Sequence, residues 1–315
     1  VAINIPQIFN SLPDNEPRKI GAYISWVAIA STCVTSSMFL TALAPNLLAV
    51  DLIAKGTGHA ITWMEWAKIM LPLMIPLFIL TPWLTYVIYP PTQKKSPEAP
   101  AWAAEELKKL GSITFKEYLM AGLATVALVL WIFGKELGVD ATITAISIVS
   151  IMILSGIISW DDLLSDKAAF NVFIWFATLV ALADGLKKVG ILDFIGKNSQ
   201  AMLSDLSLTS LIIALILLFY VLHYFFASTT AHVTALVPLF MVIASTFIPA
   251  EQLLTFTILL AGSLGVMGII TPYGCGPSPI WYGAGYISQG KWWALGAIFG
   301  AIYLIPIIVG VFIFI

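Results

Sequence analysis

The sequence predicts an all-α membrane protein whose chain crosses the bilayer several times. Of its 315 residues, 60% are hydrophobic and only 10% are charged, whereas soluble domains carry about 25% charged residues. The mean hydropathy is +0.97. The apolar runs reach about 17 residues or more without the alternation of a membrane β-strand, which favours spanning helices over a barrel.

Composition and motifs exclude several classes of function. The net charge of −2 gives no footprint for a nucleic-acid partner. The sequence has no CxxC, HExxH, P-loop or GxGxxG spacing and no visible nucleophile–base pair, so it predicts no enzyme, no metal site and no cofactor. Cys33 and Cys275 both lie in apolar stretches, where they are expected to be core thiols without a disulfide framework.

The first element is an apolar segment, residues 1–10, followed by a polar loop at residues 11–19. Val1 is not a methionine and the segment is neither a signal peptide nor a full span, so we expect the chain to begin inside a larger protein. The loop leads into a span from Ile20 to Leu40.

The first span is interrupted by hydroxyl side chains, including Ser37 and Thr41, and then by Ala44-Pro45-Asn46. Proline removes a helix hydrogen bond and disfavours helix at the residue before it. The apolar run resumes as far as Ala54, so the pattern predicts a broken membrane helix. The alternative is a simple proline kink in which the hydroxyls bond back to the helix.

The middle of the chain carries further spans. They are expected at residues 66–89, 117–133, 141–158, 170–186 and 292–315. Asp184 lies inside one of them, which makes it a functional candidate, but Lys187 and Lys188 follow closely and favour a surface ion pair. Residues 90–116 form a polar, Pro-rich linker with a charged helical stretch, and residues 189–206 look amphipathic and interfacial.

Two apolar arms, residues 207–226 and 231–248, meet at Ser228-Thr229-Thr230 without charge, glycine or proline. An aqueous loop usually carries such residues, so the turn is predicted to be re-entrant and covered by protein at membrane depth. Free N–H groups, a helix N-terminus and three hydroxyls would there favour an anion. An ordinary polar turn between two spanning helices is the alternative.

A second break follows the hairpin. The apolar run at residues 252–270 stops at Thr271-Pro272-Tyr273-Gly274-Cys275-Gly276-Pro277. Interrupted hydrophobic segments at corresponding places in two halves indicate a transporter binding site and an inverted repeat. By this repeat, the turn that matches Ser228 would fall at or before residue 1, so that residues 1–10 would be the outgoing arm of a first hairpin.

Five stretches carry a resemblance to a known family: SLPDNEPRKIGAYISW, TSSMFLTALAPNLL, HYFFASTTAHVTAL, ITPYGCGPSPIWYGAGY and WWALGAIFG. The chain resembles the divalent anion/sodium symporters. Within that family it is most similar to the bacterial citrate:succinate and tartrate:succinate antiporters and the plastid 2-oxoglutarate/malate translocators. The resemblance implies a C-terminal fragment of about two-thirds of an intact member, lacking the first hairpin tip.

The resemblance also implies a binding site. In the family, two hairpin tips and two proline-containing breaks hold a di- or tricarboxylate near the bilayer midplane. The substrate-binding positions implied here are Ser228, Thr229, Thr230, Thr271, Pro272, Pro45, Asn46 and Thr41. Accessory positions are His232, Ser37 and Gly274.

One position departs from the sodium-coupled members, which carry asparagine where this chain has Thr229. His232 follows the tip, as it does in exchanger-like members. Both features favour exchange of one anion for another over sodium coupling, so sodium is disfavoured as a cofactor. His232 has a second interpretation as a neutral, hydrogen-bonded histidine packed behind the tip, and His223 is expected to be structural.

The expected function is therefore secondary transport of small carboxylates by exchange, of the succinate, citrate, malate, tartrate or 2-oxoglutarate type. A sodium-coupled dicarboxylate symporter is the alternative, and a channel or a non-transporting fragment is a second one. The resemblance further implies a homodimer and an elevator motion of a transport domain against a scaffold. The other expected partner is the lipid bilayer. The expected location is a bacterial plasma (inner) membrane rather than a plastid envelope.

The expected domain organisation follows the repeat. Placing the loops at 11–19, 90–116, 159–169 and 287–291 in the cytoplasm leaves nine Lys and Arg inside and six outside, in agreement with the positive-inside rule. The transport domain comprises residues 1–60 and 207–288. The other segments are a scaffold helix at 61–89, a cytoplasmic linker at 90–116, scaffold and arm helices at 117–206 and a C-terminal helix at 289–315.

Overall fold

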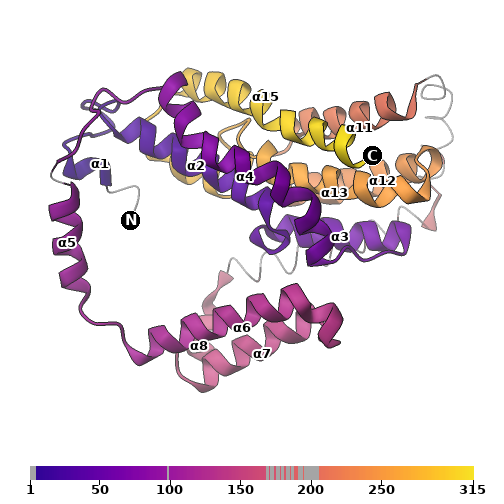
Figure 1. Ribbon diagram of the computed structural model, residues 1–315, viewed down its shortest axis with the longest axis horizontal. Coiled ribbons are helices and arrows are strands. Elements are labelled where there is room, and N and C mark those ends of the chain that lie inside the picture. Colours follow the sequence, from indigo (N-terminus) through magenta and orange to yellow (C-terminus); the bar gives the residue numbers. More distant parts are fainter. Residues whose placement is uncertain are drawn as a thin grey trace. The chain divides into compact units, whose positions relative to one another are not determined.

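The computed structural model describes residues 5–97, 99–167 and 206–315, with the isolated positions 170, 174, 178, 181, 185, 188–190 and 194. It divides into two compact units, Val1–Gln93 with Phe176–Ile315, and Lys94–Trp175 (Figure 1). Asp184 lies outside the described residues, as do most of the predicted span at 170–186 and of the amphipathic segment at 189–206.

The described part of the chain is helical, and its only strand-like pairing is an isolated bridge between Leu12 and Asn15. The first unit contains α1 (Ile5–Ile8), α2 (Gly21–Met38), η2 (Leu40–Ala42), α3 (Ala44–Thr57), α4 (Trp63–Ile88), α11 (Leu208–Leu222), η3 (His223–Phe225), α12 (Thr229–Phe247), α13 (Ala250–Met267), α14 (Pro277–Gly283) and α15 (Gln289–Phe314). The second contains α5 (Ala99–Leu110), α6 (Phe115–Leu137), α7 (Ala141–Leu154) and α8 (Trp160–Ser165).

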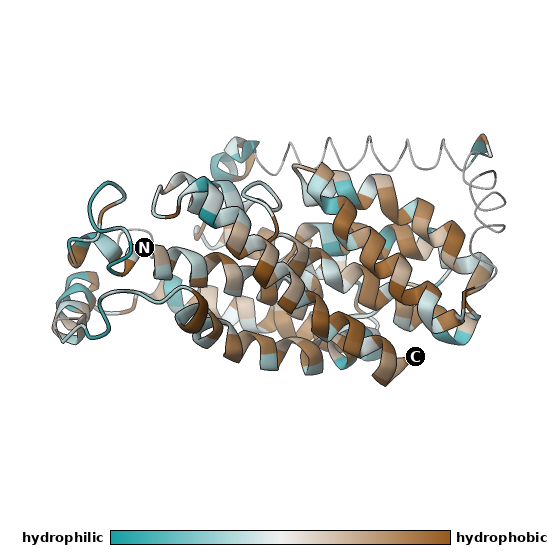
Figure 2. Cartoon of the chain, turned by 90° about the horizontal axis from the view of Figure 1, so that it is seen from above, coloured by the Kyte–Doolittle hydropathy of each residue, from teal (hydrophilic) through white to brown (hydrophobic). Residues whose placement is uncertain are grey.

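Six of the described helices are long and apolar enough to cross a membrane. They are α4, α6, α11 continued by η3, α12, α13 and α15, and Figure 2 shows hydrophobic residues along most of their length. This confirms the predicted polytopic all-α class. The predicted linker at 90–116 contains α5, in agreement with its charged helical stretch.

The first broken helix is confirmed. Helix α2 ends at Met38, and the extended residues Phe39 and Leu43 flank the short helix η2. Helix α3 then begins with Pro45 in its first turn, where the missing N–H of proline costs nothing. The proline therefore starts a new helix, and the alternative of a kink inside one continuous helix is wrong.

The structure has two helices joined by a turn at the predicted second hairpin, and it confirms the second break; whether the hairpin is re-entrant stays a prediction. Helix α11 ends at Leu222, the turn passes through η3, and α12 begins at Thr229 with Ser228 as its N-cap. Helix α13 ends at Met267, three residues before the predicted end of the apolar run at 270, and α14 begins at Pro277.

Close helix packing holds the first unit together. Helix α2 lies against α4 and α13, and α13 also lies against α15, as seen in Figure 1. The ring of Trp26 on α2 packs edge-on against Trp292 at 5.2 Å and Phe299 at 5.5 Å, both on α15. Such aromatic pairs add about 0.5–1.5 kcal/mol each beyond the area they bury.

Candidate functional site

Helices α3 and α12 pack side by side. A Cβ on Gly56 of α3 would lie 3.5 Å from the Cβ of Met241 on α12. Thr57 at the end of α3 and Ala250, which follows α12 closely, line one cleft. The C-terminal ends of the two helices therefore lie together. Since both helices begin twelve residues before the Gly56–Met241 contact, at Ala44 and Thr229, their N-termini lie together at the other end.

The hairpin tip is joined directly to the second break through one carbonyl. The oxygen of Gly274 accepts a hydrogen bond from Thr229 Oγ1 at 2.9 Å and lies 2.7 Å from His223 Nε2. The hydroxyl of Tyr273 donates to the carbonyl of Tyr224 at 3.2 Å. These contacts hold the end of α11, the start of α12 and residues 268–276 as one assembly.

His232 lies behind the tip, as one of its two interpretations predicted. Its ring is fully buried and packs edge-on against His223 at 5.0 Å, Phe219 at 4.3 Å and Phe226 at 5.0 Å. Neither ring nitrogen has a hydrogen-bond partner among the described residues. The packing was therefore predicted correctly, whereas the hydrogen bond expected for a structural histidine is not found.

The first break meets the second broken helix where α2 and α13 both end. Ser37 Oγ accepts a hydrogen bond from the backbone N–H of Val266 at 2.9 Å. A Cβ on Gly265 would lie 2.4 Å from the Ser37 nitrogen, so only glycine permits this approach. Asn46 Nδ2 donates to the carbonyls of Ser36 at 2.8 Å and Phe39 at 3.3 Å, which satisfies carbonyls freed at the break.

Unpartnered buried polar atoms gather at the same breaks. The described residues contain ten such side-chain atoms, and five belong to Asn46, His223, His232 and Thr271. Buried polar groups are normally satisfied, so each exception calls for an explanation. A polar ligand bound at this place would explain why these atoms have no partner within the protein.

The predicted site residues have different surroundings. Ser228 is exposed and caps α12 by accepting from the N–H of Ala231 at 3.4 Å. Thr230 and Pro272 are half-buried, and within the described part of the chain the hydroxyl of Thr230 has no partner. Thr41 is half-buried on η2, and no contact links it to the hairpin tip in the residues that the structure describes.

The tip is covered only in part. Thr229 and His223 are buried, but Phe225 is 81% exposed and Ser228 is exposed. The predicted covering of the turn by protein is therefore found at Thr229 and His223, but not at Phe225 and Ser228.

The structural role expected for His223 agrees with its buried contact to the Gly274 carbonyl. Sequence reasoning did not identify that partner, and it missed the close approach at Gly265. Position 223 precedes the tip by five residues and gives no periodic signal. A signal was present for Gly265, because Gly262 and Gly268 flank it at a spacing of three residues, and residues three apart share one helix face.

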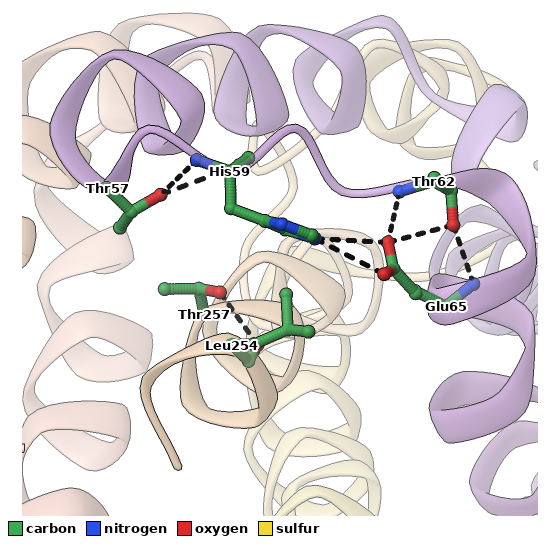
Figure 3. Close-up of polar contacts among 6 residues, drawn as sticks. All are labelled: Thr57, His59, Thr62, Glu65, Leu254 and Thr257. Atoms are coloured by element: carbon green, nitrogen blue, oxygen red, sulfur yellow. Dashed lines mark hydrogen bonds and ion pairs between the residues drawn. The ribbon is translucent and has the colours of Figure 1, made fainter. Parts of the chain in front are cut away.

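A separate cleft of about 380 Å³ opens at the far end of α3. Its lining includes His59, Glu251, Leu254 and Thr257, and none of the predicted site residues. Figure 3 shows His59 at its edge, with Nε2 3.2 Å from the carboxylate of Glu65. Two carboxylates beside this cleft make it a poor host for a carboxylate anion, because like charges repel.

The arrangement at the breaks can attract an anion although the site itself has no fixed positive charge. None of the predicted positions is Lys or Arg. Two helix N-termini lie at one end, where free N–H groups and the helix dipole attract negative charge. The hydroxyl protons of Ser228, Thr230 and Thr271 remain available to donate.

Comparison with known proteins gives the family and close relatives. The chain matches the family described as the sodium:sulfate symporter transmembrane region over residues 1–314. It is 45% identical over 307 residues, 97% of this chain, to the L-tartrate/succinate antiporter of Escherichia coli K12. The proteins of the same name from Shigella boydii and Shigella flexneri show the same identity. The chain spans 63% of the length of these relatives.

Proposed function

Because this chain belongs to the family of the sodium:sulfate symporter transmembrane region, we propose that the full-length protein is a secondary transporter that exchanges di- and tricarboxylates across a membrane. The observation that carries the proposal is the convergence of the α12 tip and the second break on the Gly274 carbonyl. The relatives are antiporters of tartrate and succinate, which makes four-carbon dicarboxylates the first substrates to test.

The predicted residues divide into donors and positioning residues. Thr229 Oγ1 donates to Gly274, and both amide protons of Asn46 have backbone acceptors, so these side chains hold the tip and the first break in place. The hydroxyls of Ser228, Thr230 and Thr271 and the N–H groups of the first turn of α12 would bind the carboxylates. Such hydrogen bonds to a charged group contribute about 1.5–3 kcal/mol each, enough for selective yet reversible binding.

Sodium-coupled symport is the second candidate, and one atom favours it. Asn46 Oδ1 is buried without a donor among the described residues, and hard cations take oxygen ligands of this kind. Exchange without sodium remains the preferred function because Thr229 stands where the sodium-coupled members carry asparagine and its hydroxyl proton already goes to Gly274.

The protein is proposed to lie in a bacterial inner membrane as a homodimer, to move its substrate by an elevator motion, and to have no enzymatic activity. The spanning helices and the bacterial relatives support the location. The dimer and the motion rest on the family resemblance.

Transport by reconstituted full-length protein separates the two candidates. Radiolabelled succinate should enter proteoliposomes only when they contain succinate or tartrate, and replacing sodium with potassium should have little effect. Uptake into empty vesicles that depends steeply on sodium would establish symport instead.

A further inference from the structure

Two positively charged side chains face one tyrosine ring at a place where the ends of three helices meet. The guanidinium carbon of Arg18 lies 4.6 Å and Nζ of Lys291 lies 5.1 Å from the centre of the Tyr89 ring. Arg18 precedes α2, Tyr89 follows α4, and Lys291 lies in the first turn of α15. We call these three residues the basic cluster; it shares no residue with the proposed transport site.

A hydrogen bond and close packing fix the basic cluster in place. Arg18 Nη2 donates to the carbonyl of Pro90 at 2.8 Å, and the Tyr89 ring is buried. Further along the same two helices, Thr81 Oγ1 on α4 lies 2.8 Å from the hydroxyl of Tyr303 on α15. The end of α4 therefore lies beside the start of α15, and the two charges are held close together because each faces the same ring.

No carboxylate in the described part of the chain forms an ion pair with either charge of the basic cluster. Glu16, in the same loop as Arg18, pairs with Lys19 at 3.5 Å. Lys291 also lies at the positive end of the α15 dipole, which disfavours a cation, and neither the Ser288 side chain nor an acidic residue of the first turn offsets it. Because like charges repel, an anion bound between Arg18 and Lys291 would relieve this electrostatic cost.

We propose that Arg18 and Lys291 bind the phosphate group of an anionic phospholipid at the membrane boundary. A guanidinium can form two parallel hydrogen bonds to a phosphate, and a lysine ammonium adds a compact positive charge. Arg18, Pro90 and Lys291 belong to the loops 11–19, 90–116 and 287–291, which the distribution of Lys and Arg places on the cytoplasmic side. Basic pockets between membrane helices on that side bind anionic head groups.

The adjacent face of α4 suits the hydrocarbon chains of such a lipid. Four exposed apolar or aromatic side chains recur on it at the i, i+4, i+7 and i+8 positions of one helix face: Ile79, Trp83, Tyr86 and Val87. Tyr86 packs edge-on against Tyr23 near the start of α2, with ring centres 6.4 Å apart. This face reaches the same helix ends as the basic cluster, which favours a lipid over a soluble phosphate as the source of the anion.

Native mass spectrometry of the detergent-solubilised full-length protein tests the site. Phosphatidylglycerol supplies a phosphate with a net negative charge, whereas phosphatidylethanolamine balances its phosphate with an ammonium group. The apparent affinity for phosphatidylglycerol should fall at least about tenfold in the variant with both Arg18→Gln and Lys291→Gln, which loses two cations close to the phosphate. Phosphatidylethanolamine should bind less tightly, and inorganic phosphate should not compete.

Two double variants are the controls. Lys55→Gln with Lys68→Gln removes two exposed lysines near the end of α3 and the start of α4, away from the basic cluster, and should keep the wild-type affinity. Arg18→Lys with Lys291→Arg preserves both charges and should keep most of it.

The melting temperature separates lipid binding from a purely structural role of Lys291. Without lipid, Lys291→Gln should melt at or above the wild-type temperature, because the change removes a cation from the positive end of α15. Added phosphatidylglycerol should then raise the melting temperature of the wild type more than that of the variant. A lower melting temperature without lipid, together with an equal gain from lipid, would assign Lys291 to packing on Tyr89 and overturn the proposal.

The binding measurements can overturn the proposal as well. Equal affinity in the wild type and in the variant with Arg18→Gln and Lys291→Gln would remove both cations from the site. An equal loss in the control with Lys55→Gln and Lys68→Gln would mean that the lipid is attracted to any positive charge. Equal affinity for phosphatidylethanolamine would show that the net charge of the lipid is not recognised, and competition by inorganic phosphate would make a soluble anion the ligand.

Discussion

Three neighbouring hydroxyls at the hairpin tip have three different roles. Ser228 caps α12, Thr229 binds the Gly274 carbonyl, and Thr230 has no partner among the described residues. The sequence shows only three adjacent hydroxyls and cannot separate these roles, because the partners of Thr229 lie in a segment 45 residues away. The N-cap of α12 is Ser228 and not Thr230.

Replacing Thr230 tests the role of its hydroxyl in binding. Thr230→Val keeps the shape and deletes the donor. If the hydroxyl binds a carboxylate, the loss is about 1.5–3 kcal/mol, which corresponds to a roughly ten- to hundredfold weaker affinity. The melting temperature without substrate should change little. Binding of succinate to the full-length protein is the measurement.

Thr234→Val is the matched control for this variant. Thr234 lies one turn further along α12, and its Oγ1 donates to the carbonyl of Thr230 at 2.7 Å. Substrate affinity should survive its loss. Unchanged affinity in Thr230→Val would remove that hydroxyl from the binding site.

For the individual helices, the positions of their ends could be predicted better than the contacts between them. The sequence predicted the two breaks and the hairpin because proline, glycine and hydroxyl residues interrupt apolar runs. The local sequence pattern could not predict that α2 and α13 end against each other, or that α3 and α12 begin together; only the family resemblance implied that the tip and the breaks meet. Those facts depend on packing between segments about 185 to 230 residues apart in sequence, for which local pattern carries no information.

The crossing of α2 and α13 should not tolerate a larger residue at Gly265. In Gly265→Ala the added Cβ would meet the Ser37 nitrogen at 2.4 Å and Ser36 C at 2.7 Å, and backbone atoms cannot move aside without breaking the Ser37–Val266 bond. We expect a loss of about 1–3 kcal/mol, the usual range for overpacking. A thermal melt in detergent measures it.

The control for this crossing is Gly290→Ala. Gly290 lies in the first turn of α15, and an added Cβ there meets nothing within 4 Å. Alanine has a higher helix propensity than glycine, so the Gly290→Ala variant should be as stable as the wild type or slightly more stable. Equal melting temperatures in the two variants would contradict the close approach of α2 and α13.

Helix α7 gives a prediction for pH. The N–H groups of Thr142 and Ile143 donate to the Asp140 carboxylate at 2.7 and 3.3 Å, and these bonds lower the pKa of Asp140 below its ordinary value of 3.8. Because the folded pKa is the lower one, the cap stabilises α7 fully above the unfolded pKa and is lost as pH falls through the folded pKa.

Amide hydrogen exchange checks the cap. Protection of the Thr142 and Ile143 amides, corrected for intrinsic exchange, should fall as the pH drops below 3.8. Asp140→Asn also caps a helix but carries no carboxyl. Its protection should be independent of pH over this range, and a fall equal to that of the wild type would assign the effect to another group.

At the scale of the whole molecule, the chain consists of two units that meet in sequence at Gln93 and Lys94. The predicted scaffold helix, α4, packs against α2, α13 and α15 inside the first unit, so the division into transport domain and scaffold remains a prediction. The polar composition of residues 90–116 indicated a boundary here, but sequence alone gives no contacts by which to group the helices.

Limited proteolysis tests this division. Lys94 and Lys95 are exposed and lie outside any helix, whereas Lys68 is exposed within α4. Trypsin should cut the detergent-solubilised chain after Lys94 or Lys95 well before Lys68, because cleavage needs locally unfolded backbone. The variant with both Lys94→Gln and Lys95→Gln should lose the early fragment. First cleavage within α4 would refute the boundary.

The shared starting end of α3 and α12 has a consequence for the response of transport to acidity. Hydroxyls and backbone N–H groups neither gain nor lose protons in the physiological range. In a transporter that binds its substrate with such donors, none of the binding groups changes its protonation state in this pH range. Its preference among charge states of a dicarboxylic acid would then follow the ionisation of the acid in solution, and the cell could change flux by changing the acidity of the medium without any change in the protein.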